Sequence, residues 1–164
     1  MKPLPAWVAF GGNVGDVRAT VGQALAVLDA VPGLRLLARS AFYRTPAWGR
    51  TDQPDFINGV AAFETTLAPR ALLEALLATE QRFGRIRDED APRWGPRTLD
   101  LDLLAVDGLV LDEPGLGLPH PRLHERAFVL VPLAEIAPGL VVPGRGRVAD
   151  LLAAVDAAGI EAIP

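Results

Sequence analysis

Two aspartates stand two residues apart in the stretch RTLDLDL, at Asp100 and Asp102. In a β-strand, side chains two positions apart share a face, so the acids would project together while Leu99, Leu101 and Leu103 point into a core. Like charges at this spacing repel each other unless a cation or water screens them. Carboxylates without His or Cys nearby suit Mg²⁺, which takes one or two of them together with substrate phosphates. The pattern therefore predicts a magnesium site, with the solvated face of an edge strand as the alternative.

The loop before this strand is rich in arginine. Arg85, Arg87, Arg93 and Arg97 all fall within it. Guanidinium groups beside a metal site can neutralise phosphate oxygens, which is what phosphoryl transfer requires. The length and charge of the loop also make it a candidate lid. The alternative is an exposed surface loop whose arginines pair with its own acidic residues.

Glu80 lies on an expected helix that begins at Pro69 and ends at Gly84. It falls in the middle of an apolar stripe formed by Leu72, Leu73, Leu76, Leu77 and Phe83. A carboxylate there, close to the helix C-terminus, needs a partner. An internal ion pair with Arg82 or Arg85 would supply one, and hydrogen bonds from a polar ligand would be the functional alternative.

An aromatic residue and an amide share a face of the next expected strand, at Phe56 and Asn58. A flat ligand could stack on the ring while the amide reads its donor and acceptor edge. A phenylalanine in a strand is more commonly part of the core. Trp48 and Trp94 lie on loops beside Pro or Gly and are harder to explain by packing.

Both histidines of the chain occur in PHPRLHER, at His120 and His124, together with Arg122 and Arg126. Two histidines four residues apart could bind zinc from one face of a helix. Here no glutamate follows the first histidine as in the H-E-x-x-H motif, and Pro121 would interrupt the helix, so a zinc site is not expected. Phosphate contact fits this segment better. The segment GGNVGD lacks both the P-loop ending and the dinucleotide fingerprint, so a tight turn into a helix is its simplest interpretation.

The remaining pattern predicts alternating strands and helices. Strands are expected at 6–10, 34–43, 56–65 and 97–103, with a return strand near 109–111. Helices are expected after an Asp16 cap, from Pro69, in short pieces broken at Pro132, and over RVADLLAAVDAAG up to Gly159. The order predicts an α+β fold of ferredoxin-like type, an antiparallel sheet with helices packed mainly on one face and mobile loops over the active site.

Composition limits the class of protein. We expect one domain over residues 1–164, since the length suffices for a substantial core. The chain has no cysteine, which excludes disulfides and thiolate metal sites and suits a reducing compartment. The start of the sequence has no signal peptide or membrane span, so we expect a cytoplasmic protein without a membrane partner, and a monomer. A net charge of −4 argues against nucleic acid.

The motifs FYRTP, DQPDFINGV, RWGPRTLDLDLL, PHPRLHERAF and EIAP follow one another in this order. In order and separation they resemble the 6-hydroxymethyl-7,8-dihydropterin pyrophosphokinases of the folate pathway, over nearly the whole chain. The resemblance implies transfer of the β,γ-pyrophosphoryl group of ATP to the hydroxymethyl oxygen of the reduced pterin, with release of AMP.

The same resemblance implies a role for each motif residue. Asp100 and Asp102 would hold two Mg²⁺ ions, and Arg85 and Arg97 would stabilise charge on the transferring group. The ATP-binding residues would be Glu80, Arg87, Leu103, His120, His124 and Arg126. The pterin-binding residues would be Thr45, Pro46, Trp48, Phe56, Asn58, Trp94 and Phe128. The pterin would lie between the two phenylalanine rings, with its polar edge read by the threonine and the asparagine.

Some positions depart from the family pattern. Gly12 stands where a serine is usual, Phe56 where some members have tyrosine, and Pro121 where some carry a tyrosine. The segment DEDAP also lengthens the arginine-rich loop. Two other functions stay open on the residues alone. A Mg²⁺-dependent phosphohydrolase or nuclease would explain the paired acids, and a non-catalytic ferredoxin-like module would explain the pocket.

Overall fold

The computed structural model describes residues 2–46, 55–84 and 98–163. Within these residues, six strands form one antiparallel sheet in the order β10, β3, β4, β1, β5, with β2 also paired to β4. The strands are β1 (Leu4–Gly12), β2 (Leu34–Arg39), β3 (Phe42–Thr45), β4 (Phe56–Thr65), β5 (Asp100–Val106) and β10 (Glu161–Ile163). This arrangement confirms the predicted α+β fold with an antiparallel sheet.

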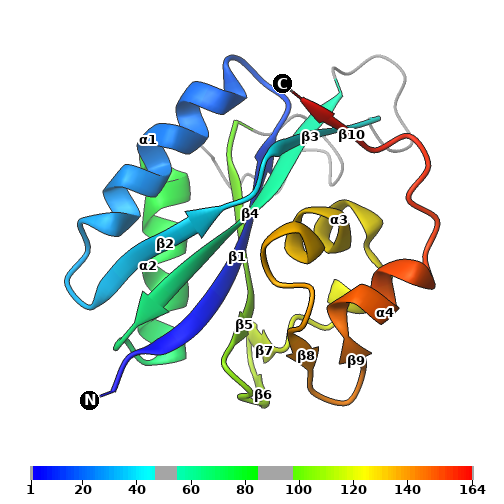
Figure 1. Ribbon diagram of the computed structural model, residues 1–164. Coiled ribbons are helices and arrows are strands. Elements are labelled where there is room, and N and C mark those ends of the chain that lie inside the picture. The colour runs from blue at the N-terminus through cyan, green and yellow to red at the C-terminus, as the bar shows by residue number, and fades with distance from the viewer. Residues whose placement is uncertain (1, 47–54, 85–97, 164) are drawn as a thin grey trace.

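Helices cover both faces of the sheet (Figure 1). The two longer ones, α1 (Val17–Asp29) and α2 (Pro69–Arg82), lie side by side on one face, as predicted. The shorter α3 (Ala127–Ile136) and α4 (Val148–Ala153) add a smaller layer on the other face. Small elements complete the fold: the hairpin of β6 (Leu111–Glu113) and β7 (Leu116–Leu118), the 3₁₀ turn η1 (Leu123–Glu125), and the hairpin of β8 (Val141–Val142) and β9 (Gly146–Arg147).

Local sequence signals account for the starts of the two long helices. The Asp16 side chain accepts a hydrogen bond of 3.1 Å from the N–H of Ala19 and so caps α1. Pro69 occupies the first turn of α2, where its missing N–H costs nothing. Both helix starts agree with the sequence prediction.

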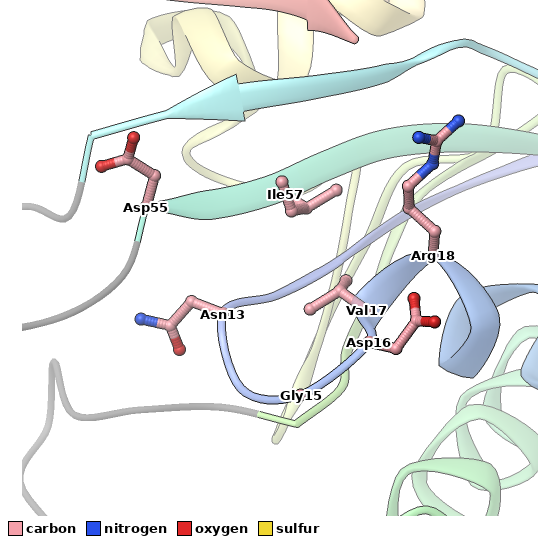
Figure 2. A pocket seen from close by; sticks show the side chains of 7 residues that line it. All are labelled: Asn13, Gly15, Asp16, Val17, Arg18, Asp55 and Ile57. Carbon is pink, nitrogen blue, oxygen red and sulfur yellow. The ribbon is translucent and has the colours of Figure 1, made fainter. Parts of the chain in front are cut away.

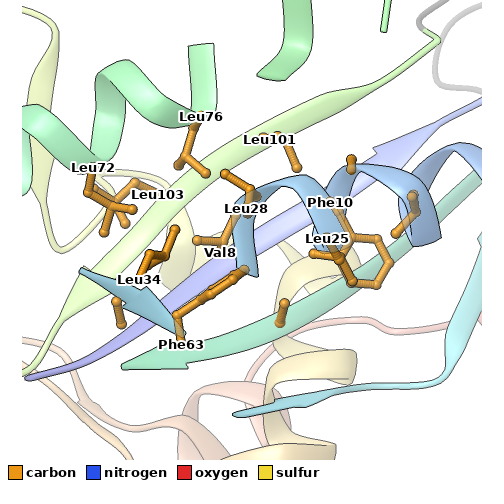
Figure 3. Close-up of a cluster of buried hydrophobic side chains, with 14 of the residues drawn as sticks. Val8, Phe10, Leu25, Leu28, Leu34, Phe63, Leu72, Leu76, Leu101 and Leu103 are labelled. Carbon is orange, nitrogen blue, oxygen red and sulfur yellow. The ribbon is translucent and has the colours of Figure 1, made fainter. Parts of the chain in front are cut away.

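The main core lies between the sheet and the helices α1 and α2 (Figure 3). It contains the expected apolar positions of α1, namely Val17, Val21, Leu25 and Leu28. From α2, Leu72 and Leu76 are fully buried. A second, smaller cluster on the other face of the sheet joins Val60 and Leu104 to α3 and α4. The sheet is therefore buried on both faces over part of its area.

The predicted strand at 34–43 is divided into β2 and β3 at Ser40 and Ala41. Both parts pair with β4, β2 with its end and β3 with its beginning. Ser40 bridges the break, since its N–H donates to Val60 O and its Oγ accepts from Val60 N–H, each at 2.9 Å. The break lets Ala41 direct its N–H away from the sheet, toward α3.

Three expectations for the second half of the chain are wrong in detail. The segment after Asp107 does not return along β5, because β6 pairs with β7 instead. Pro132 does not break its helix but lies inside α3. The last helix ends at Ala153 rather than near Gly159, and the following chain forms β10 against β3.

Candidate active site

The paired acids stand where the strand period predicts. Leu101 and Leu103 are 4% and 5% exposed and pack in the main core. Asp100 is half-buried and Asp102 is exposed, both on the opposite face of β5. Their register partners on β1 are Gly11 and Ala9, which carry no charge. The two carboxylates therefore share one face beside an uncharged floor.

The donor chemistry of this pair fits Mg²⁺. Both side chains offer hard oxygen ligands, and the exposure of Asp102 leaves room for water and phosphate. Within the described residues, no cluster of three or more His, Cys, Asp or Glu side chains forms a ready-made metal site. Magnesium at this position would therefore take most of its ligands from water and substrate, as it commonly does.

Glu80 is almost completely buried, with 1% of its surface exposed. Its carboxylate accepts a hydrogen bond of 2.8 Å from the backbone N–H of Leu101. A carboxylate buried in an apolar stripe needs a hydrogen-bond partner, and a backbone amide of β5 is one partner of Glu80. The bond ties α2 to the strand that carries the acids.

Asn58 and Thr45, the two residues predicted to read the polar edge of a ligand, are hydrogen-bonded to each other. Asn58 Nδ2 donates to Thr45 Oγ1 at 3.2 Å. Asn58 is the register partner of Gly11 on β1, and Gly11 in turn is the partner of Asp100 on β5. These three residues form a row across three strands, on the face that also carries α3. The row joins the predicted ligand-reading residues to the predicted metal residues.

The two phenylalanines predicted to contact the ligand lie on separate elements. Phe56 begins β4 and is half-buried, next to its register partner Thr45. Phe128 lies in the first turn of α3 and is 36% exposed, with the guanidinium of Arg126 5.6 Å from its ring centre. Both rings are accessible enough to contact a ligand. Pro46, directly after β3, is exposed.

His120 lies beside β5, because its N–H donates to Leu104 O at 2.7 Å. Its Nδ1 accepts from the N–H of Arg122 at 3.1 Å, so the neutral ring carries its proton on Nε2. Burial lowers the pKa of His120 below its ordinary value, the charges of Arg126 and Arg122 lower it further, and Asp102 opposes them. The ring is thus held as a neutral donor near the acid pair.

A shallow pocket of about 240 Å³ opens where β1 ends and β4 begins (Figure 2). It is bounded by the turn after β1, the start of α1 and the residues that enter β4. Its lining residues are Asn13, Gly15, Asp16, Val17, Arg18, Asp55 and Ile57. Val17 and Ile57 belong to the main core, so this pocket opens on the α1 side of the sheet, and no site residue predicted above lines it.

Comparison with known proteins shows the family of the chain. The family model for 7,8-dihydro-6-hydroxymethylpterin-pyrophosphokinase (HPPK) matches residues 7–138. The chain belongs to the HPPK family. It is therefore an ATP-dependent pyrophosphokinase of folate biosynthesis, and the main functional interpretation of the sequence is confirmed over its alternatives.

Two curated relatives match over almost their whole length. A 2-amino-4-hydroxy-6-hydroxymethyldihydropteridine pyrophosphokinase of Methylorubrum extorquens is 49% identical over 158 residues, covering 96% of this chain and 98% of that protein. The protein of the same name from Pseudomonas aeruginosa is 47% identical over 158 residues, covering 96% of each chain.

The HPPK fold is also seen in a solved structure. A crystal structure of Plasmodium falciparum HPPK-DHPS matches with a TM-score of 0.71 at 12% identity, over 93% of this chain. The chain spans 41% of that protein, so the match concerns one part of it and shows the fold alone. In the described part of this HPPK chain, no helix is long and apolar enough to cross a membrane.

Sequence reasoning missed one polar contact beside the site. Glu135 on α3 accepts from the N–H of Ala41 with both carboxylate oxygens, at 3.1 and 3.0 Å, and from the hydroxyl of Tyr43 at 2.5 Å. Burial and the neighbouring carboxylate raise the pKa of Tyr43 to about 12. This contact fastens α3 to β3, the two elements that carry Phe128 and Thr45. The only signal for it in the sequence is a glutamate on an otherwise apolar helix.

Five of the predicted site residues lie outside the described residues. They are Trp48, Arg85, Arg87, Trp94 and Arg97. Leu103 and the half-buried His124 and Arg126 are described. Leu103 packs in the main core, on the face of β5 opposite the acids.

Proposed function

We propose that this chain transfers the β,γ-pyrophosphoryl group of ATP to the hydroxymethyl oxygen of 6-hydroxymethyl-7,8-dihydropterin. The observation that carries the site assignment is the row of Asn58, Gly11 and Asp100. An amide that can read a heterocycle and a carboxylate that can hold a phosphate-bound metal face the same side of the sheet. They are two strands apart, or roughly 10 Å. That spacing suits a ring on one side and phosphates on the other.

On the pterin side, Thr45 and Asn58 would read the polar edge of the ring. Their mutual hydrogen bond fixes the orientation of the amide before the substrate arrives, which reduces the entropy cost of binding. Phe56 and Phe128 would contact the two ring faces. Pro46, Trp48 and Trp94 would complete the pocket, as the family resemblance implies.

On the phosphate side, Asp100 and Asp102 would hold two Mg²⁺ ions together with ATP. When bound, the ions would neutralise the phosphate charge and orient the attacking hydroxyl. Neutral His120 would donate from Nε2 to a phosphate or ribose oxygen. The resemblance also implies ATP contacts by Glu80, Arg87, Leu103, His124 and Arg126, although the side chains of Glu80 and Leu103 are almost completely buried in this structure. By the same resemblance, Arg85 and Arg97 would act on the transferring group.

The reaction is a substitution at the β-phosphorus of ATP. The hydroxymethyl oxygen forms the new bond, the bond from the β-phosphorus to the oxygen shared with the α-phosphate breaks, and AMP leaves with that oxygen. The hydroxyl proton passes to water. Because the protein contributes no covalent step, positioning and electrostatic stabilisation supply the catalysis. We further propose that the enzyme is a monomer and works in the cytoplasm. A chain without cysteine has no disulfide that the reducing conditions there could break.

The test is AMP formation from ATP and Mg²⁺ with and without the reduced pterin, under anaerobic conditions. We expect AMP and pterin pyrophosphate in equal amounts, only when both substrates are present. Phosphate release without the pterin would favour a phosphohydrolase. Pterin binding without AMP would favour a non-catalytic binding module.

A further inference from the structure

Gly11 is the crowded centre of the row that joins the two halves of the site. It is buried in β1 between Asn58 on β4 and Asp100 on β5. A Cβ atom added to Gly11 would stand closer to Asn58 Oδ1 than real atoms approach, and 2.9 Å from the carbonyl oxygen of Ile57. The amide of Asn58 therefore lies directly over the backbone of Gly11.

This contact bears on the orientation of the amide. With Oδ1 above Gly11, Nδ2 of Asn58 turns toward Thr45 and donates to its hydroxyl. Any side chain at position 11 would push the amide off the sheet, since the carbonyl of Ile57 blocks a small shift of the backbone. The same side chain would also rise between Asn58 and Asp100, across the path from the ring to the phosphates.

We propose that Gly11 is a positioning residue for the pterin: it holds the Asn58 amide flat against β1 and leaves open the floor over which the hydroxymethyl arm reaches Asp100. This inference rests on the proposed function, because it assigns Asn58 to the pterin and Asp100 to the metal. It adds a residue without a side chain to the site. It predicts that a side chain at position 11 weakens pterin binding and leaves ATP binding unchanged.

The test compares Gly11→Ala with Gly22→Ala in the full chain. Gly22 lies exposed in α1, and a Cβ atom added there would have no neighbouring atom within 4 Å, so it controls for the general effect of replacing glycine. The dissociation constants of the reduced pterin and of ATP are measured separately. For Gly11→Ala we expect the pterin constant to rise by about tenfold or more, as for a lost hydrogen bond to a polar ligand, and the ATP constant to stay unchanged. Equal pterin affinity in both variants would overturn the inference.

A second readout needs no substrate. The side-chain amide resonances of Asn58 should move in Gly11→Ala and stay in place in Gly22→Ala, whether or not the chain has the proposed activity. AMP formation by the wild type tests the proposed function by itself. A failure of the proposed function can therefore be distinguished from a failure of the positioning role of Gly11. Unmoved Asn58 resonances in a folded Gly11→Ala protein would overturn the positioning role.

The double variant Gly11→Ala with Asn58→Ala decides the matter if Gly11→Ala does not fold. Removing the amide removes the closest contact of a Cβ atom at position 11 and leaves its contact with the carbonyl oxygen of Ile57 at 2.9 Å. Recovery of folding in the double variant supports the inference. A double variant that still fails to fold, beside a folded Asn58→Ala protein, would overturn it, because the backbone of Ile57 would then be what Gly11 accommodates.

Discussion

The carboxylate of Glu80 accepts a hydrogen bond of 2.8 Å from the backbone N–H of Leu101, the amide that lies between Asp100 and Asp102. β5 is the last strand on its side of the described sheet, so this N–H has no further described strand to which it could donate. A helix side chain thus supplies the acceptor. The position of both acids depends on a contact from α2.

Two substitutions of Glu80 should distinguish the effect of its hydrogen bond to Leu101 from the effect of its negative charge. Glu80→Gln retains an acceptor oxygen, so the unfolding free energy should change little, whereas Glu80→Ala leaves a buried amide unpaired and should cost about 1–3 kcal/mol beyond the loss of packing. Denaturant unfolding measures the difference. If Glu80→Gln lost as much stability as Glu80→Ala, the bond to Leu101 would not be the stabilising contact.

The contact between Tyr43 and Glu135 should be visible in an alkaline titration. Tyr43 is the only tyrosine of the chain, so the ultraviolet absorbance of tyrosinate reports on it alone. We expect a midpoint near the pKa of about 12, against the ordinary 10.0, and a shift back toward the ordinary value in Glu135→Gln.

The sign of the effect on stability follows from the raised pKa. The folded state holds the Tyr43 proton more tightly than the unfolded state, so this contribution is complete below pH 10.0 and is lost as the pH rises through about 12. Circular dichroism along the titration confirms that the chain is folded. An ordinary midpoint in the folded wild type would contradict the contact.

His120 should titrate below its ordinary value of 6.5, because burial disfavours the charged ring. The unfolded state then binds more protons near that pH, so the contribution of His120 to stability is present above pH 6.5 and declines as the pH falls through the lower folded pKa. Imidazole NMR measures the midpoint, with His124→Gln to assign the two rings. A midpoint at or above 6.5 would show that the attraction of Asp102 outweighs burial.

The alternation of residues 99–103 could be read from the sequence because it depends only on the two-residue period of a strand. The helix starts at Asp16 and Pro69 are local for the same reason. The division of β2 from β3 could not be read there, since the stretch 34–43 carries no turn signal. The break depends on Ser40 bonding to Val60 and on Ala41 bonding to Glu135, both distant in the sequence.

The site shows the same limit. Asn58 and Asp100 could each be selected by residue type, but their alignment through Gly11 depends on the register of three strands. Glycine in GGN indicates a turn from sequence alone, and only the position of the Asn58 amide gives it another role. Pro132 likewise predicts a break, although packing of α3 against β4 holds the helix together through it.

The most direct test of the account is turnover by Asp102→Asn over a range of Mg²⁺ concentrations, with ATP and the reduced pterin saturating. Asp102 is exposed, so the unfolding free energy of the variant should stay within about 0.5 kcal/mol of the wild type. We expect formation of AMP and pterin pyrophosphate to fall by about 100-fold or more, with a raised Mg²⁺ requirement, because one carboxylate of the metal pair is gone. Wild-type turnover and an unchanged Mg²⁺ requirement in the folded variant would contradict the assignment of the metal site to β5.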